Sequence, residues 1–171
     1  MNSKNNKFLL ITIGILLIVS LSFSIGLISY EKIIVIKDLD EPKTTKFTLD
    51  ENRFTLGYIH SVLLTPAEEM FLVNEDNQLL LQKTVYESFG VGLPYSRENY
   101  EFEIKDEKLI LYVKREFPSL NMRISPIPKH WVQIGDEKIE LLNTVSKEED
   151  LIKIYARDAI VIRVGEEELI L

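Results

Sequence analysis

The pattern of apolar and polar positions divides the chain into one long apolar run followed by many short ones. From Phe8 to Tyr30 no residue is charged, and Ile, Leu, Val and Phe dominate. As a helix the run extends about 34 Å at about 1.5 Å per residue, enough to cross a hydrocarbon core of about 30 Å. Lys4 and Lys7 precede it and predict a cytoplasmic N-terminus at residues 1–7. We therefore expect a transmembrane anchor, or an uncleaved signal, at residues 8–30, with the rest of the chain outside the cytoplasmic membrane.

A cleaved signal peptide is the alternative for this segment. Its basic start is present, and Ser22-Phe-Ser24 is a small-x-small site. The apolar run is longer than the roughly 7–15 residues typical of signal peptides, and it continues past Ser24. These features favour the anchor.

After the anchor, short apolar segments alternate with period two, which is typical of β-strands. Residues 31–52 hold one strand, 32–36, and a polar stretch, and we interpret them as a tether or edge strand. Residues 147–154 are the best candidate for a helical turn, and Arg157-Asp158 for a hairpin. Between residues 53 and 171 strands are expected at 78–86, 100–104, 108–113, 121–124, 131–134, 139–142, 151–155, 160–164 and 168–171. The prediction for residues 53–171 is an all-β extracytoplasmic domain, an antiparallel sandwich or barrel.

Charge and cysteine content narrow the function classes. The chain has a net charge of −7, and without Lys4 and Lys7 the remainder is still more acidic. Such a surface lacks the basic footprint of a nucleic-acid-binding protein, and anionic headgroups repel it, so we expect the anchor to hold the domain at the membrane. The absence of cysteine excludes disulfides, thiolate metal sites and thiol catalysis.

The stretch from Phe54 to Phe71 carries the first candidate chemistry. A strand-like run contains His60, one of two histidines, then breaks at Thr65-Pro66 and restarts with Glu68 and Glu69. Thr65 to Glu68 matches a helix capping box with proline at the first helical position. Because a strand-like segment follows at once, we predict a bend between two strands that brings the glutamates back alongside the His60 strand.

His60 and Ser61 do not make a catalytic pair, because adjacent strand residues point to opposite faces. The chain has no nucleophile-elbow motif. His60 with Glu68 or Glu69 across the hairpin would need a further ligand to form a metal site. No catalytic residue, metal ion or cofactor is therefore assigned, and a partly buried, hydrogen-bonded histidine is the simplest interpretation.

A second unusual stretch contains two glycines at alternate positions. A phosphate-binding loop would need a helix after them, but Pro94 follows and no helical pattern comes next. The remaining interpretations are a structured loop that packs Phe89 and Tyr95 or a loop that faces a ligand. The candidate residues here are Ser88, Gly90, Gly92, Pro94 and Tyr95.

These stretches together resemble the family called domain of unknown function 1850 (DUF1850). The resemblance rests on Tyr58-Ile-His-Ser-Val62, Thr65-Pro-Ala-Glu-Glu69, Ser88-Phe-Gly-Val-Gly-Leu-Pro-Tyr95 and Ala156-Arg-Asp-Ala-Ile-Val-Ile-Arg163. It covers roughly residues 50 to 165, and Ala67 stands where the family pattern usually has Val.

The resemblance implies a small exported or membrane-anchored protein without an assigned activity. Such proteins are often encoded beside permeases of tripartite ATP-independent periplasmic (TRAP) transporters, especially those with the TAXI class of solute receptor. It therefore implies an accessory or binding protein of solute uptake, with a permease or solute receptor as partner. Its contact surface would comprise Tyr58, His60, Ser61, Thr65, Glu68, Glu69 and the 90–95 loop. A metal- or His/Glu-dependent hydrolase and a purely structural domain without ligand stay open as alternatives.

Overall fold

The computed structural model describes residues 3–24, 27–60, 64–87 and 101–171. The chain divides into two compact units. Residues 32–157 form the larger unit, and residues 1–31 with 158–171 form the smaller one. The larger unit therefore begins inside the expected tether and holds most of the β structure.

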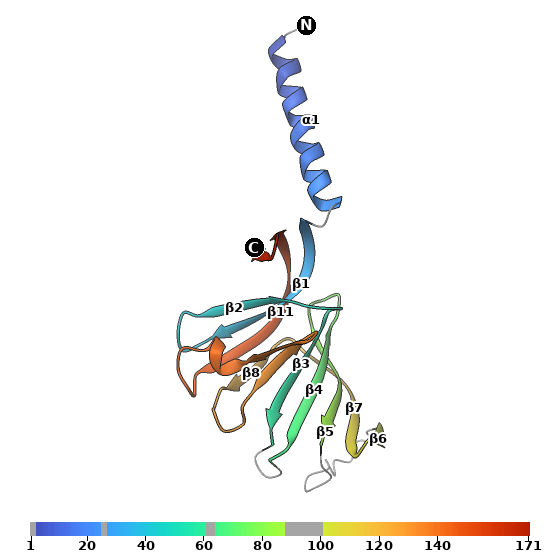
Figure 1. The fold of residues 1–171 in the computed structure, drawn as a ribbon, viewed down its shortest axis with the longest axis vertical. Coiled ribbons are helices and arrows are strands. Elements are labelled where there is room, and N and C mark those ends of the chain that lie inside the picture. Colours follow the sequence, from blue (N-terminus) through green and yellow to red (C-terminus); the bar gives the residue numbers. More distant parts are fainter. Residues whose placement is uncertain (1–2, 25–26, 61–63, 88–100) are drawn as a thin grey trace. The chain divides into compact units, whose positions relative to one another are not determined.

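The N-terminal element is helix α1, Ser3–Ser24 (Figure 1). It ends before Tyr30, the predicted end of the apolar segment, because strand β1 begins at Ile28. The hydroxyls of Thr12 and Ser22 donate to the carbonyls four residues earlier, each at 3.0 Å, so neither is left unsatisfied. Within the part of the chain that the structure describes, no helix has the length and apolar character needed to cross a membrane.

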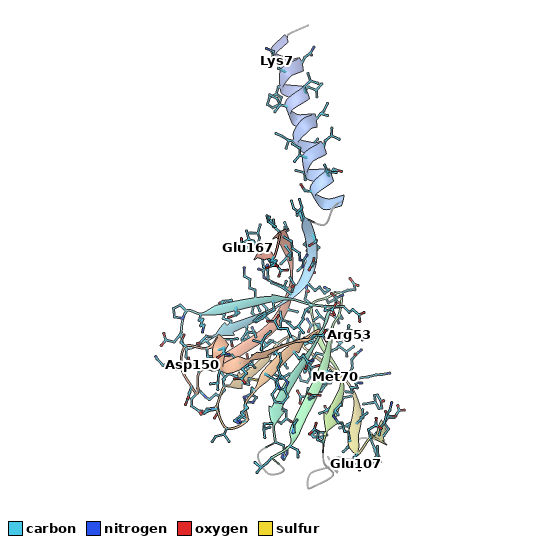
Figure 2. All side chains as sticks on the ribbon, in the orientation of Figure 1. Lys7, Arg53, Met70, Glu107, Asp150 and Glu167 are labelled. Atoms are coloured by element: carbon cyan, nitrogen blue, oxygen red, sulfur yellow. The ribbon has the colours of Figure 1, made fainter. Side chains whose placement is uncertain are left out.

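The side chains of α1 project outward all round the helix (Figure 2). Its large apolar side chains are exposed rather than packed on one face. The exposed set is Phe8, Leu9, Leu10, Ile11, Ile13, Ile15, Leu16, Leu17, Ile18, Val19 and Leu21.

The larger unit contains a seven-stranded antiparallel sheet, in which β3, β4 and β5 lie side by side in Figure 1. Its strands, in spatial order, are β10 (Glu137–Glu140), β9 (Trp131–Ile134), β3 (Arg53–Ile59), β4 (Pro66–Val73), β5 (Leu79–Tyr86), β7 (Lys108–Phe117) and β6 (Glu101–Lys105). Two-residue turns with positive φ connect several strands, as at Asp106 and Glu107, which suits the twist of hairpins.

The second sheet of the larger unit is built on β1 (Ile28–Asp38), which lies between β2 (Thr44–Thr48) and β11 (Leu151–Val164). Strand β8 (Leu120–Arg123) pairs with the beginning of β11. Ile33 to Ile36 are all buried. The expected tether thus contains an interior strand and, at β2, an edge strand.

One core lies between the apolar faces of the two sheets in the larger unit. Phe54 and Phe71 stack across β3 and β4 with ring centroids 5.0 Å apart. Ile34 of β1 and Ile152 of β11 belong to the same cluster from the other sheet. The prediction of an antiparallel all-β fold is therefore confirmed; neither sheet closes into a barrel over the described residues.

Two local predictions are wrong. Residues 147–154 form no helical turn: the Asp150 carboxylate accepts from the backbone N–H of Lys147 at 2.8 Å and closes a tight turn before β11. Arg157-Asp158 forms no hairpin, because β11 runs straight through both residues. A 3₁₀ helix at Leu141–Thr144 follows β10 instead of a strand continuing to residue 142.

In the smaller unit, β12 (Glu167–Ile170) pairs with the end of β11 across Gly165, whose φ is +64°. Arg163 makes a two-pronged contact with the Glu31 carboxylate, at 2.5 and 2.7 Å, and a third with Glu168 at 2.9 Å. Hydrogen bonds from Arg163 hold the pKa of Glu31 below its usual value despite desolvation, with a further hydrogen bond from Ser29. This cluster ties the start of β1 to the C-terminal hairpin within the unit.

Candidate functional site

The hairpin of β3 and β4 confirms the predicted bend at Thr65-Pro66. The two strands pair antiparallel, with Ile59 opposite Pro66. At the turn, the N–H of His60 donates to the Thr65 carbonyl at 2.9 Å, and the N–H of Leu64 donates to the His60 carbonyl at 2.8 Å. Leu64 has a φ of +55°. The local backbone, rather than a helix cap, turns the chain here.

The two glutamates of this hairpin lie on opposite faces of the sheet. Glu69 lies opposite Leu56, a core residue, and Glu68 lies opposite Gly57. Because successive strand residues alternate, Glu69 is on the core-facing side and Glu68 on the outer side. Both pair with β3 positions three or four residues before His60, so the register does not place either directly across from the imidazole.

Tyr58, Ala67 and Tyr86 form one row across β3, β4 and β5 on the core-facing side. Ala67, at the centre of the row, is fully buried, whereas both tyrosines are partly exposed. Glu69 follows two residues after Ala67 and so lies on the same face, diagonal to both phenols. We call Tyr58, Glu69 and Tyr86 the inner-face triad.

Burial raises the pKa of the Glu69 carboxyl. Burial, together with the neighbouring Tyr86 and Glu69, raises the pKa of Tyr58 to about 12. The pKa of Tyr86 is raised by burial and by Glu69. Among the described residues, no cation or hydrogen-bond donor is positioned against the Glu69 carboxylate, which is the reason that desolvation dominates its pKa.

His130 extends the row on the far side of Tyr58. It immediately precedes β9, and its ring centroid lies 6.3 Å from that of Tyr58. Burial lowers the pKa of His130, so the imidazole is neutral at neutral pH. Its Nδ1 is buried without a hydrogen-bond partner in the described part of the chain.

The outer face of the same hairpin has a different chemistry. The indole of Trp131 lies flat against Gly57, where an added Cβ would be 2.0 Å from its Cε2 atom. The Lys138 ammonium lies 3.8 Å from the centroid of the indole. Glu68 and Glu140 join them around a hollow of about 190 Å³. Gly57 is therefore required by close packing of the indole on the strand.

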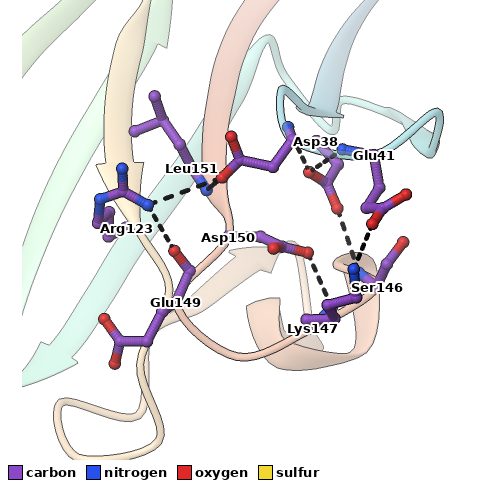
Figure 3. Close-up of polar contacts among 9 residues, drawn as sticks. Asp38, Glu41, Arg123, Ser146, Lys147, Glu149, Asp150 and Leu151 are labelled. Carbon is purple, nitrogen blue, oxygen red and sulfur yellow. Dashed lines mark hydrogen bonds and ion pairs between the residues drawn. The ribbon is translucent and has the colours of Figure 1, made fainter.

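A third polar cluster lies where the β1–β2 loop meets the segment before β11 (Figure 3). The Asp38 carboxylate accepts from the N–H groups of Asp40 and Glu41, each at 3.0 Å, and of Ser146 at 3.2 Å. Burial alone raises the pKa of Asp38, but these amides and a hydrogen bond with Asp150 outweigh it, and the pKa is lowered. Asp38 is 2% exposed, so this cluster holds loops together rather than facing solvent.

The structure brings together some of the predicted site residues. Tyr58 and Glu69 belong to the inner-face triad, Glu68 lines the outer hollow, and His60 and Thr65 form the hairpin turn. The predictions for Ser61, Ser88, Gly90, Gly92, Pro94 and Tyr95 lie outside the described residues.

The sequence missed Tyr86 and His130. Tyr86 ends the predicted strand 78–86 with the period-two alternation that puts it on the core-facing side, so the strand pattern contained a usable signal. His130 carries no such signal, because only the pairing of β9 with β3 places it beside Tyr58. In the described ranges, no three His, Cys, Asp or Glu side chains are arranged to hold a metal ion.

A family model with the description "Domain of unknown function" (DUF1850) matches residues 54–141, which include the inner-face triad, the hairpin and Trp131. A comparison with curated proteins and a comparison with solved structures each found no match. The family match covers just over half of the chain, so the chain belongs to the DUF1850 family.

Proposed function

We propose that this chain is a membrane-anchored extracytoplasmic binding protein, whose inner-face triad holds a positively charged or hydrogen-bond-donating group of a ligand or partner. The observation that carries the proposal is the Glu69 carboxyl. It is partly buried on the core-facing side and has no compensating cation among the described residues. Keeping such a group costs folding free energy, and residues of this kind concentrate at functional sites.

The chemistry of the triad favours a cationic group over an anionic one. Glu69 supplies a negative charge, and Tyr58 and Tyr86 add hydroxyl donors and electron-rich ring faces, which attract ammonium and guanidinium groups. An anion would meet the Glu69 charge in a poorly solvated site. A bound cation would lower the pKa of Glu69 and remove the cost of its burial.

The location proposed for this domain depends on α1. A helix that is apolar on all sides is stable only where an apolar environment surrounds it, and the exposed side chains of α1 form such a surface. We infer that α1 anchors the chain in the cytoplasmic membrane as a single pass, with the C-terminal domain outside the cytoplasm. The resemblance to proteins encoded beside tripartite permeases supports a role as an accessory of solute uptake.

The location has a direct test, because the chain lacks cysteine. Single cysteines introduced by Ser3→Cys and Glu107→Cys would be probed in whole cells with a membrane-impermeant maleimide. We expect labelling at 107 only, and retention of the protein in membranes after alkaline carbonate extraction. Release by carbonate, or equal labelling at both positions, would contradict the anchor.

The binding role is tested with two adjacent glutamates as a matched pair. Glu69→Gln removes the inner-face charge, and Glu68→Gln removes the same charge from the outer face. Full-length protein in non-ionic detergent would be titrated calorimetrically with a panel of amino acids, diamines and quaternary amines. We expect binding of a cationic compound that Glu69→Gln weakens by at least about tenfold and Glu68→Gln leaves unchanged. Co-purification with a neighbouring permease, lost in the same variant, would support the accessory role.

A second candidate function is acid–base catalysis, and the raised pKa of Glu69 is the observation that favours it. A carboxyl whose pKa is raised by burial can stay protonated and donate a proton to a leaving group. A hydrolase would show turnover that Glu69→Gln abolishes without loss of substrate binding. Ligand binding without turnover favours the first candidate.

A further inference from the structure

The largest described hollow lies away from the inner-face triad, between β5 and β7. It has a volume of about 880 Å³, within the range of small-molecule sites. Leu80, Gln82 and Lys83 contribute from β5, and Tyr112, Val113, Lys114, Arg115 and Glu116 from β7. We call it the β5–β7 groove.

A β-bulge creates the groove. In the pairing of β5 with β7, Leu81 lies opposite Arg115 and Lys83 opposite Tyr112, so Gln82 has no partner in the register. The pairing of β5 with β4 also skips Gln82, since Phe71 pairs with Leu81 and Met70 with Lys83. A bulge re-aims the side chains around it and bends the strand. The extra residues here separate the two strands' side chains and leave the hollow.

The groove is basic in an acidic protein. Lys83, Lys114 and Arg115 line it, against one carboxylate, Glu116. Elsewhere in the described chain Arg53, Lys108, Arg123, Lys147 and Arg163 each lie within an ion pair. The three groove cations take part in no such pair over the described ranges. They are therefore available to an external anion.

Two further contacts fix the walls of the groove. The Arg115 guanidinium lies over the Phe117 ring at 5.2 Å from its centroid, which limits its motion and leaves its donors free. The Tyr112 hydroxyl donates to Glu103 at 3.0 Å, which holds the phenol ring against the groove. Leu80 and Val113 supply apolar surface for a carbon skeleton.

We propose that the β5–β7 groove is a binding site for a small organic anion with carboxylate or phosphate groups. Arg115 would receive the first acidic group in a two-pronged contact, and Lys83 and Lys114 would receive further charge. The site is independent of the inner-face triad and would take a ligand of opposite charge.

The test uses full-length protein in non-ionic detergent, titrated calorimetrically with citrate, inorganic phosphate and the uncharged trimethyl citrate. We expect citrate to bind with a Kd below about 1 mM, phosphate more weakly, and the triester not at all. Arg115→Gln and Lys114→Gln should each weaken citrate binding about tenfold. Arg115→Lys keeps the charge and should weaken it less.

Lys37→Gln is the matched control, because it removes the same charge from an exposed position on β1 outside the groove. An unchanged unfolding midpoint for each variant shows that the fold is intact. Equal loss of citrate binding in Lys37→Gln, or no citrate binding at all, would overturn the proposal. So would a wild-type protein that binds phosphatidylglycerol vesicles through Arg115 but no soluble anion, because the groove would then be a membrane contact.

Discussion

Asp38 and Glu69 are both removed from solvent in the larger unit, yet their surroundings differ. Asp38 is 2% exposed and accepts hydrogen bonds from three backbone amides. Glu69 is partly exposed, and no donor is positioned against it among the described residues. Amides outweigh burial and lower the pKa of Asp38, while burial raises the pKa of Glu69. The more buried acid is therefore the more easily ionised one.

The comparison separates a fold determinant from a site residue. Backbone amides around Asp38 need an acceptor, so the carboxylate and the loops stabilise each other. Nothing described near Glu69 needs its charge. A glutamate whose removal would favour folding is retained for a reason outside the fold, and this is the physical basis of the binding proposal.

The largest effect is expected from Asp38→Ala. The substitution leaves the amides of Asp40, Glu41 and Ser146 without an acceptor, at a cost of about 1–3 kcal/mol for each group that stays buried. Because water reaches part of this loop, we expect a total loss of about 3 kcal/mol in the free energy of unfolding, measured by urea denaturation. Asp136→Ala, in an exposed turn, is the control and should change little. A loss below about 1 kcal/mol would remove Asp38 from the fold determinants.

Glu69→Gln should act in the opposite direction. The amide carries no charge in the poorly solvated site, so the free energy of unfolding at neutral pH should rise by about 1 kcal/mol. Glu68→Gln, on the outer face, should stay within about 0.5 kcal/mol of the wild type. A destabilised Glu69→Gln protein would show that the carboxylate has a structural partner, and the contrast with Asp38 would fail.

The pH dependence of these differences sharpens the contrast further. The folded-state pKa of Glu69 lies above its usual value of 4.5, so the advantage of Glu69→Gln should appear as pH rises through that raised pKa and vanish below about 4.5. The folded-state pKa of Asp38 lies below its usual value of 3.8. The disadvantage of Asp38→Asn should therefore persist down to about that pH and fade only as pH falls further. Unfolding curves across this range would reveal the two windows, and a reversed order would contradict the assignment.

The smallest effect concerns the phenols beside Glu69. Burial is the main reason that the pKa of Tyr58 is about 12, with smaller contributions from Tyr86 and Glu69. Glu69→Gln should therefore lower the pKa of Tyr58 slightly, which an alkaline titration followed by ultraviolet absorbance would detect. Glu68→Gln should leave the titration unchanged, and an equal shift in both variants would indicate a general charge effect.

The sequence was most informative where structure is local. Thr65-Pro66 and the Asp106-Glu107 turn are short-range features, and both behave as predicted. Strand β1 was interpreted as a tether or edge because polar residues follow it, although a continuous apolar run such as Ile33 to Ile36 is typical of an interior strand. Two adjacent charges, Arg157 and Asp158, suggested a turn, but each makes a polar interaction within the long β11.

The site was only partly predictable, because its members come together through strand pairing. Tyr58 and Glu69 lie in one hairpin, and their region was recognised from the sequence. Tyr86 and His130 join them only through the pairing of β4 with β5 and of β3 with β9. The sequence also placed Glu68 and Glu69 together as candidates, whereas the alternation of a strand separates them onto two faces.

Trp131 is the only tryptophan in the chain, and its position makes it a natural spectroscopic reporter. Its indole lies between the Gly57 backbone and the Lys138 ammonium on the outer face, and the preceding residue, His130, borders the inner-face triad. Its fluorescence emission should therefore respond strongly when an outer-face ligand displaces Lys138, and weakly when the triad is occupied. The intact protein thus contains a probe that distinguishes occupancy of the two faces without any label.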